Sequence, residues 1–298
     1  MNMTSTLTES TPRAVGARPP SHDRSIGGIL VDAGRLTPEL AERVLRHQKE
    51  HNLRFGDAAL ALGVLNEEDI RFALAHQFEY TYLAPGERPA TAEVVAAYQP
   101  NHRCVEAIRA LRSQLMLRWL DNRVDRKSLA VVSAEKRVGR SFVTANLAVV
   151  FSQLGERTLL IDANLRSPSL HQLFHVENRV GLSSMLGVGM GHEPIVQLPA
   201  FVGLSIMPAG PLSPNPQELL SRPAFRTLVD RAVEHYDVVL IDTPSWSQGA
   251  DAQIIAARAG AALLVTRLDY TSVNTANNFV ETLSQSGCQV LGAIMNQF

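Results

Sequence analysis

The sequence predicts a doubly wound α/β domain with a mainly parallel sheet, preceded by a small all-helical domain. From Ser128 onward, short apolar runs rich in β-branched residues alternate with helical segments, which is typical of a parallel sheet covered by helices on both faces. Upstream, residues 25–77 contain two copies of one helical pattern. These two observations divide the chain into two domains of different class.

The bulk composition excludes several classes of protein. The chain has 298 residues, 45% of them hydrophobic, and 28 Lys+Arg against 29 Asp+Glu give a net charge of −1. Such balance disfavours a binder of nucleic acid as a polymer. Cys104 and Cys288 lack the spacing of a paired metal ligand or disulfide framework, which fits a reducing compartment. Because neither a signal peptide nor a long apolar run is visible, we expect a cytoplasmic protein without direct membrane insertion.

Four regions follow one another along the chain. The expected boundaries are a disordered lead-in over 1–23, a helical repeat domain over 24–85, a Pro-containing linker over 86–102 and the nucleotide-binding domain over 103–298.

The internal repeat appears when the chain is shifted by 29 residues, which places Gly27 over Gly56 and Gly34 over Gly63. In each copy a first apolar helix stops at the second of these glycines, since helices commonly end at glycine. Thr37 or Asn66 then caps a second helix with apolar residues at helical spacing. The pattern predicts four short helices.

The α/β region begins with a helix from about Cys104 to Leu120. Six strands are then expected, in the runs SLAVVS, TLLIDAN, LSIMPA, DVVLIDT, AALLVT and QVLGAIM. Doubly wound sheets bind ligands at the carboxyl ends of their strands. Functional residues are therefore expected just after these runs.

A candidate phosphate-binding loop, AEKRVGRS, lies between the first predicted strand and the next helix. Against the pattern G-x-x-x-x-G-K-[ST], Ala134 stands at the first glycine and Gly139 at the second. Arg140 replaces the lysine, and Ser141 supplies the hydroxyl for Mg²⁺. On the loop alone, a plain strand-to-helix turn with a capping serine is the alternative.

Two other predicted strands end in an acidic residue, Asp162 in LLIDANLRSP and Asp242 in VVLIDTPSW. One carboxylate can orient or deprotonate a nucleophile while the other holds a Mg²⁺ ion that carries phosphate oxygens. Each aspartate could instead simply cap the helix that follows.

Five segments in order resemble the bacterial tyrosine autokinase family of polysaccharide biosynthesis and export, most closely the EpsG-type chain-length determinant kinases. They are AEKRVGRS, LLIDANLRSPSLHQLF, NRVGLSSML, MPAGPLSPNPQELLSRPAF and VVLIDTPSW, within residues 103–298. The resemblance implies a deviant P-loop NTPase fold of the MinD/ParA-like superfamily that binds ATP and Mg²⁺, with Asp162, Arg140 and Asp242 catalytic and Ser141, Asp162 and Asp242 at the metal. The implied nucleotide contacts are Val138, Gly139, Arg140, Ser141, Phe142 and Asn296, although Asn296 could also be a buried strand-end residue.

This sequence departs from the family pattern at several positions. Arg140 keeps the positive charge of lysine but is bulkier and planar, so phosphoryl transfer is expected to be slow. Asn164 stands where the family usually has a second aspartate, which leaves Asp162 as the best base. The sequence ends at Phe298 without the C-terminal tyrosine cluster that is typical of the family. Its five tyrosines are scattered along the chain: Tyr80, Tyr82, Tyr98, Tyr236 and Tyr270.

Assembly is suggested by the helix before the first strand. Glu106, Arg109 and Arg112 fall at spacing three and share one helical face, which could also be a solvated charged face. EAIRALR resembles the family's oligomerisation motif, which implies a homo-oligomeric ring. The resemblance also implies a membrane-embedded chain-length determinant, a polysaccharide co-polymerase, as the partner that holds the protein peripherally at the inner membrane.

The paired repeats resemble the N-terminal module of some type II secretion ATPases (MshEN-like), which implies cyclic di-GMP as a further ligand. The alternative is a helical docking domain, and Ser25 stands where an arginine is expected. The matching positions are Arg54, Phe55, Gly56 and Gln77 in the second copy and Ile26, Gly27 and Gln48 in the first.

Three functions remain open from the sequence. The first is an ATP-dependent tyrosine autokinase that regulates exopolysaccharide polymerisation or chain length. The second is a nucleotide-binding assembly factor of the secretion machinery with weak or no phosphotransfer, which Arg140 and Asn164 favour. The third is a MinD- or ParA-like ATPase. Glu135 is evidence against this function, because it stands where the P-loop of those ATPases has its early signature lysine.

Overall fold

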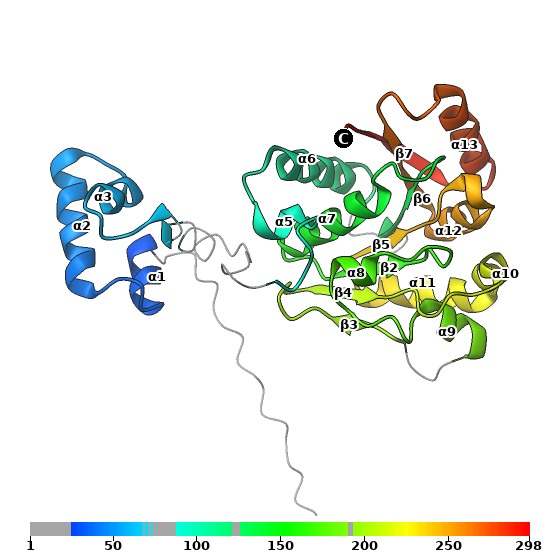
Figure 1. The fold of residues 1–298 in the computed structure, drawn as a ribbon, viewed down its shortest axis with the longest axis horizontal. Helices are drawn as coiled ribbons and strands as arrows, with labels where there is room; N and C mark the ends of the chain where they lie inside the picture. The colour runs from blue at the N-terminus through cyan, green and yellow to red at the C-terminus, as the bar shows by residue number, and fades with distance from the viewer. Residues whose placement is uncertain (1–24, 68, 71–72, 74–87, 121–125, 190–192) are drawn as a thin grey trace, which may run out of the picture. The chain divides into compact units, whose positions relative to one another are not determined.

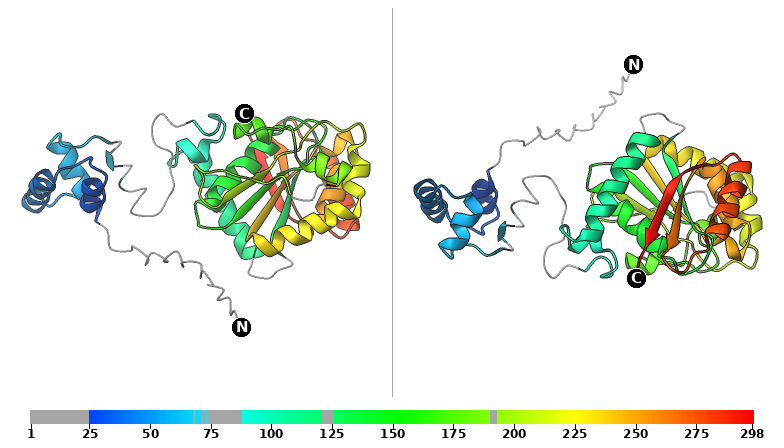
Figure 2. Two further views of the ribbon diagram at one scale, coloured as in Figure 1. Left: turned by 90° about the horizontal axis from the view of Figure 1, so that it is seen from below. Right: turned by 90° about the horizontal axis from the view of Figure 1, so that it is seen from above.

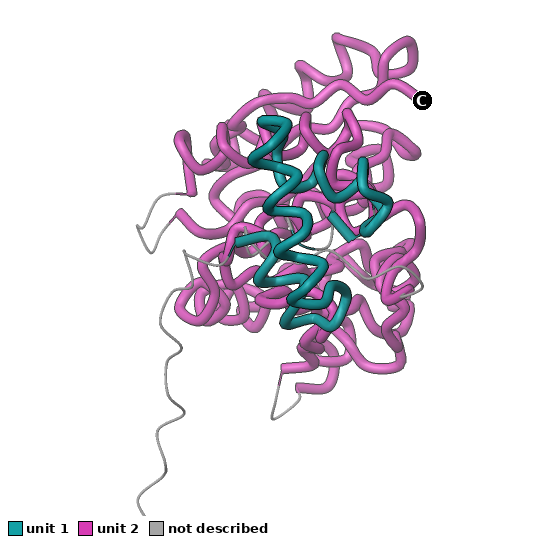
Figure 3. The backbone as a smooth tube through the Cα atoms, turned by 90° about the vertical axis from the view of Figure 1, so that its left-hand side faces the viewer, with its two compact units in different colours: residues 1–78 teal, residues 79–298 magenta. Residues whose placement is uncertain are grey.

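The computed structural model describes residues 25–67, 69, 70, 73, 88–120, 126–189 and 193–298. The chain forms two compact units, residues 1–78 and 79–298, coloured separately in Figure 3. The expected lead-in over 1–23 and part of the linker lie outside the described residues. Among the residues that are described, no helix is long and apolar enough to cross a membrane.

The N-terminal unit is helical, as its repeat predicts. It contains α1 (Ile26–Asp32), α2 (Pro38–His51) and α3 (Phe55–Ala61), and helical residues follow again from Glu67. Gly34 at φ +67° and Gly63 at φ +61° end α1 and α3 in the left-handed conformation that favours glycine.

Both predicted caps are present in this unit. The Thr37 hydroxyl accepts the Leu40 N–H at 3.3 Å, and the Asn66 amide oxygen accepts the Asp69 N–H at 2.9 Å. Asp69 accepts the Asn66 N–H in return, which forms a reciprocal cap. A small core that includes Leu30 and Val44 holds the helices together.

The second unit is a seven-stranded sheet in the order β3-β4-β2-β5-β1-β6-β7. All neighbouring strands are parallel except β3 and β4. The strands are β1 (Ser128–Val132), β2 (Thr158–Asp162), β3 (Val196–Gln197), β4 (Leu204–Met207), β5 (Val238–Asp242), β6 (Ala261–Arg267) and β7 (Gln289–Asn296). Six are the predicted strands.

Helices cover both faces of the sheet (Figures 1 and 2). Alternate strand residues face the two layers: Leu129 packs with α6 and α7, whereas Ala130 packs with α11, α12 and α13. The helical elements are α5 (Val95–Tyr98), α6 (Arg103–Arg118), α7 (Arg140–Ser152), α8 (Leu170–Leu173), α9 (Leu182–Val188), α10 (Pro216–Ser221), α11 (Pro223–His235), the 3₁₀ turn η2 (Trp246–Gln248), α12 (Asp251–Ala259) and α13 (Val273–Gln285).

The described part of the expected linker is built into the α/β unit. Ala90, Val94 and Ala97 are buried in the same core as α7. Asn146 of α7 accepts the Ala96 N–H at 2.8 Å and donates to the Glu93 carbonyl at 2.9 Å. Residues 88–102 therefore belong to the nucleotide-binding unit rather than connecting to it.

Candidate nucleotide-binding site

The carboxyl ends of β1, β2 and β5 bring the predicted site residues together. β5 lies between β2 and β1, and Asp162 pairs directly with Asp242 in the parallel register. Both side chains are fully buried. The two acidic strand ends therefore form one site beside the loop that follows β1.

The loop between β1 and α7 has the shape of a phosphate-binding turn. Gly139 precedes α7 at φ +84°, and a β-carbon at this position would lie 2.4 Å from the Asn296 Nδ2 atom. The Asn296 amide donates to the Val138 carbonyl at 2.8 Å. The first N–H groups of α7 have no partners within the helix and can bind phosphate oxygens at its positive end.

Asp242 is the centre of the hydrogen bonds in this site. Its carboxylate accepts the Ser141 hydroxyl at 2.6 Å, the Thr144 hydroxyl at 3.3 Å and the Arg140 Nε–H at 3.3 Å. The Arg140 guanidinium also donates to the Ser133 hydroxyl at 2.6 Å. Arg140 thus links the end of β1 to the end of β5.

Asp162 is held by backbone groups instead. One oxygen accepts the Ser169 and Leu170 N–H groups, each at 3.1 Å, and the other accepts the Asn164 N–H at 3.2 Å. The Asn164 side chain turns to Ser167, with whose backbone N–H and carbonyl it bonds. Asn164 therefore shapes this turn.

The two buried carboxyl groups have raised pKa values. Burial and the negative charge of Asp242 raise the pKa of Asp162 to about 7. Burial also raises the pKa of Asp242, against the opposing effect of Arg140 and the two hydroxyls. A divalent cation would offset this excess of negative charge.

The donor set fits the Mg²⁺ ion that this fold implies. Mg²⁺ takes oxygen ligands, commonly one or two carboxylates together with substrate phosphates. The Ser141 hydroxyl and the Asp242 carboxylate lie side by side, with Asp162 at the paired position on β2. Ser141 and Asp242 would hold the ion, and Asp162, the third metal residue that the sequence predicts, lies beside them.

Val138 and Phe142 support the loop by packing. Val138 is buried with Val131, Val143 and Val265, and Phe142 packs against the same cluster. The Phe142 carbonyl accepts the Asn146 amide at 2.9 Å. The two side chains thus fix the loop by packing, and the Val138 carbonyl is held by the Asn296 amide.

Three contributors were missed by the sequence analysis. Thr144 lies one helical turn after Ser141, a spacing that places it on the same face and could have indicated it. The bond from Arg140 to the Ser133 hydroxyl depends on how the loop folds back on the end of β1. Arg137 adopts φ +58°, a left-handed conformation that favours glycine, and its side chain gives no sign of this.

The three predicted oligomerisation residues all make contacts within the chain. Arg109 donates to the Pro100 carbonyl and pairs with Glu106, while Arg112 donates to the Val150 carbonyl at 2.7 Å. The Glu106 side chain is 61% exposed. The ring remains a prediction, and Glu106 is the member most open to a neighbour.

Five of the candidate cyclic di-GMP residues lie at the starts of α1 and α3. A β-carbon at Gly27 would be 3.1 Å from the Phe55 ring, and one at Gly56 would be 3.2 Å from Ile70. Ile26 begins α1, Arg54 precedes α3, and Gln48 lies in α2. Gln77 lies outside the described residues. Close helix packing is thus one reason for the two glycines.

The fold and the site together define a ParA-like P-loop NTPase. Residues 124–297 match the family model described as ParA, "NUBPL iron-transfer P-loop NTPase". This fold implies a nucleotide and Mg²⁺ as ligands.

Relatives place the chain more narrowly. It is 38% identical over 203 residues to the tyrosine-protein kinase YwqD of Bacillus subtilis, over 68% of this chain and 85% of that protein. The kinase domain of the Escherichia coli tyrosine kinase ETK is similar in structure, with a TM-score of 0.65 and 33% identity over 68% of this chain and 79% of that one.

A third similar protein is the chimerical CapA2B2, with a TM-score of 0.64 and 29% identity over 78% of this chain and 98% of that one. The chain belongs to the bacterial tyrosine-protein kinase family. The predicted fold class and enzyme class are both confirmed.

Proposed function

We propose that this chain is an ATP-dependent protein tyrosine autokinase that regulates exopolysaccharide polymerisation, chain length or export. The observation that carries the proposal is the convergence of the Arg140, Ser141 and Thr144 side chains on Asp242, with Asp162 on the paired strand position. This arrangement supports positioning a nucleoside triphosphate and a nearby nucleophile.

The proposed reaction uses Asp162 as the general base. A tyrosine hydroxyl attacks the γ-phosphorus of ATP, the bond from that phosphorus to the β–γ bridging oxygen breaks, and ADP leaves. The phenolic proton passes to the Asp162 carboxylate, which lies at the strand position paired with Asp242. When bound, Mg²⁺ would neutralise charge that develops on the phosphate oxygens.

Arg140 has a double role in this proposal. Its guanidinium carries the positive charge that the phosphates need, but it also bonds Asp242 and Ser133. When a nucleotide binds, the guanidinium would have to leave these partners and contact the phosphates instead. This requirement is a physical reason to expect slow phosphoryl transfer.

The experiment is incubation of the full chain with Mg²⁺ and γ-labelled ATP, followed by detection of labelled tyrosine. We expect the label with the wild type and its loss in Asp242→Ala. Asp230→Ala is the matched control, because Asp230 is a mostly exposed carboxylate whose only described ion pair is on the surface. Nucleotide binding without labelled tyrosine would instead favour the second function, a nucleotide-binding assembly factor without phosphotransfer. The bonds of Arg140 to Asp242 and Ser133 are also consistent with that function.

We further propose that a membrane-embedded chain-length determinant holds the kinase at the cytoplasmic face of the inner membrane. The family resemblance supports a paired system, as does the similarity to the chimerical CapA2B2, whose name joins two components. Addition of the partner's cytoplasmic tail should increase labelling, and sedimentation with Mg-ATP should show a ring. A monomer whose labelling does not respond to the tail would contradict both points.

Cyclic di-GMP is proposed as a ligand of the N-terminal unit because the starts of both repeat copies meet at Gly27 and Phe55. Calorimetric titration of the full chain should give heat that Arg54→Ala reduces. Equal heats with the wild type and Arg54→Ala would leave the unit as a helical docking domain.

A further inference from the structure

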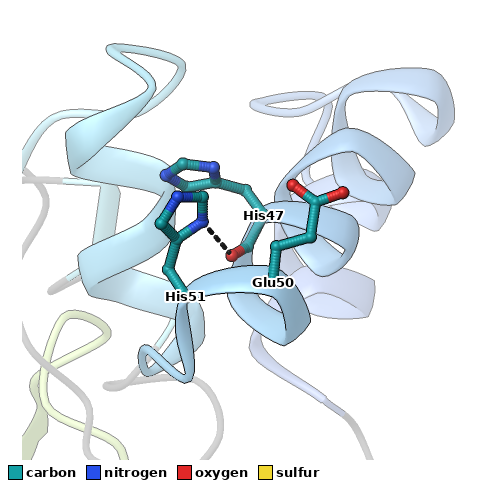
Figure 4. A group of neighbouring side chains, drawn as sticks. All are labelled: His47, Glu50 and His51. Atoms are coloured by element: carbon teal, nitrogen blue, oxygen red, sulfur yellow. Dashed lines mark hydrogen bonds between the residues drawn. The ribbon is translucent and has the colours of Figure 1, made fainter.

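The last turn of α2 carries a cluster of potential metal ligands that the kinase reaction does not use. Figure 4 shows His47, Glu50 and His51 at this helix end. One ligand atom from each residue lies within 4.8 Å of the others. His47 and His51 are four residues apart, so they occupy the same face of the helix, with ring centroids 4.1 Å apart.

One imidazole already makes the kind of hydrogen bond that many metal-binding histidines make. The His51 Nδ1 atom lies 3.2 Å from the His47 carbonyl oxygen. Because that oxygen can only accept, Nδ1 must carry the proton and Nε2 the free lone pair. Metal-binding histidines usually donate their other ring N–H to a carbonyl or carboxylate in this way.

The electrostatics of the helix end favour a cation. α2 ends at His51, and the last carbonyl groups of a helix carry its partial negative charge. Glu50 adds a carboxylate on the same turn. His47 is half-buried, while Glu50 and His51 are exposed and accessible from solvent.

From this arrangement we infer that His47, Glu50 and His51 bind a divalent transition-metal ion such as Zn²⁺. Imidazole nitrogens together with one carboxylate suit Zn²⁺, Ni²⁺ or Cu²⁺, whereas Mg²⁺ and Ca²⁺ prefer sites made only of oxygen ligands. Three protein ligands leave at least one coordination position of Zn²⁺ for water or a donor from a partner. The site would give the N-terminal unit a ligand of its own, distinct in chemistry from the nucleotide.

Calorimetric titration of the full chain with Zn²⁺ tests the inference. We expect His47→Ala and His51→Ala each to weaken the tightest binding step about tenfold or more. His235→Ala is a matched control, since His235 is also an exposed histidine at a helix end whose Nδ1 contacts a carbonyl, that of Arg231, at 2.9 Å. Position 231 offers no second imidazole, so this control should not change the binding.

A second measurement identifies the ligand atoms directly. With one equivalent of Cu²⁺, the paramagnetic resonance spectrum of the wild type should show coupling to two imidazole nitrogens, and the coupling should be reduced in either histidine variant. Circular dichroism should be unchanged, because His51 is exposed and His47 is only half-buried at the end of the helix. Superimposable Zn²⁺ isotherms for wild type and the His47→Ala/His51→Ala double variant would overturn the inference, as would an equal loss in His235→Ala.

Discussion

Asp162 and Asp242 occupy directly paired positions on the adjacent parallel strands β2 and β5, and both are fully buried. Arg140 is the cation that bonds one member of this pair, Asp242. The pair concentrates negative charge at the edge of the sheet where a nucleotide and its metal ion would bind. This relationship leads to predictions about stability as well as activity.

The contribution of Asp162 to the stability of the nucleotide-free protein should fall as pH rises from 3.8 to about 7. The pKa of Asp162 is raised in the folded state, so the folded protein holds this proton more tightly than the unfolded chain does. The contribution is complete below 3.8 and is lost above about 7.

Asp162→Asn should flatten this dependence, because the amide does not titrate. Its oxygen can still accept the Ser169 and Leu170 N–H groups, so the local structure is kept. Urea unfolding across this pH range, with and without the substitution, measures the difference. Parallel pH profiles for both proteins would contradict the assignment.

Arg140→Ala should destabilise the protein by about 3 kcal/mol, since it leaves Asp242 buried without its cation. Urea unfolding measures the change. The control is Arg226→Ala, which removes an exposed pair with Asp230 and should cost less than about 0.5 kcal/mol. Equal losses in the two variants would show that the Arg140 pair contributes no more than a surface pair.

Gly139→Ala should reduce ATP affinity and cost about 1 to 2 kcal/mol in backbone strain alone, because residue 139 has φ +84°. The added methyl would also displace Asn296 from Val138. Gly155→Ala shares the strain, at φ +93°, but its β-carbon would meet nothing within 4 Å. Urea unfolding and ATP titration of both variants separate the effect of backbone strain from the effect of displacing Asn296. Equal ATP affinities of the two variants would contradict a role of Asn296 in nucleotide binding.

Asn146→Ala should cost about 2 kcal/mol, because it leaves the buried Ala96 N–H and the part-buried Glu93 carbonyl without this partner. It should also make residues 88–102 more susceptible to proteolysis. Ser152→Ala is a suitable control, since its buried hydroxyl bonds only the Val149 carbonyl of the same helix. Proteolysis at equal rates in the two variants would argue against this attachment.

Arg137→Gly should leave the stability unchanged or raise it by up to about 1 kcal/mol. Arginine at φ +58° carries backbone strain that glycine lacks, although glycine loses more conformational entropy on folding. Thermal unfolding measures the shift. A clear loss of stability would indicate that the Arg137 side chain makes a contact that offsets the strain.

The sequence by itself predicted most of the elements and the candidate site residues Arg140, Ser141, Asp162 and Asp242. The repeat predicted the N-terminal helices and both caps, since capping depends on residues only a few positions apart. Apolar runs predicted six of the seven strands. β3 was missed because its two exposed residues on an edge strand carry no burial pattern.

Only the tertiary structure decided which groups meet. Asp162 and Asp242 belong to separate strands, and their pairing depends on the position of β5 between β2 and β1. The bond of Arg140 to Asp242, the packing of residues 88–102 against α7 and the bond of Arg112 to Val150 likewise join distant parts of the chain. Local patterns fix backbone conformation and burial over a few residues, whereas the strand order and side-chain packing that set these contacts arise from the whole core at once.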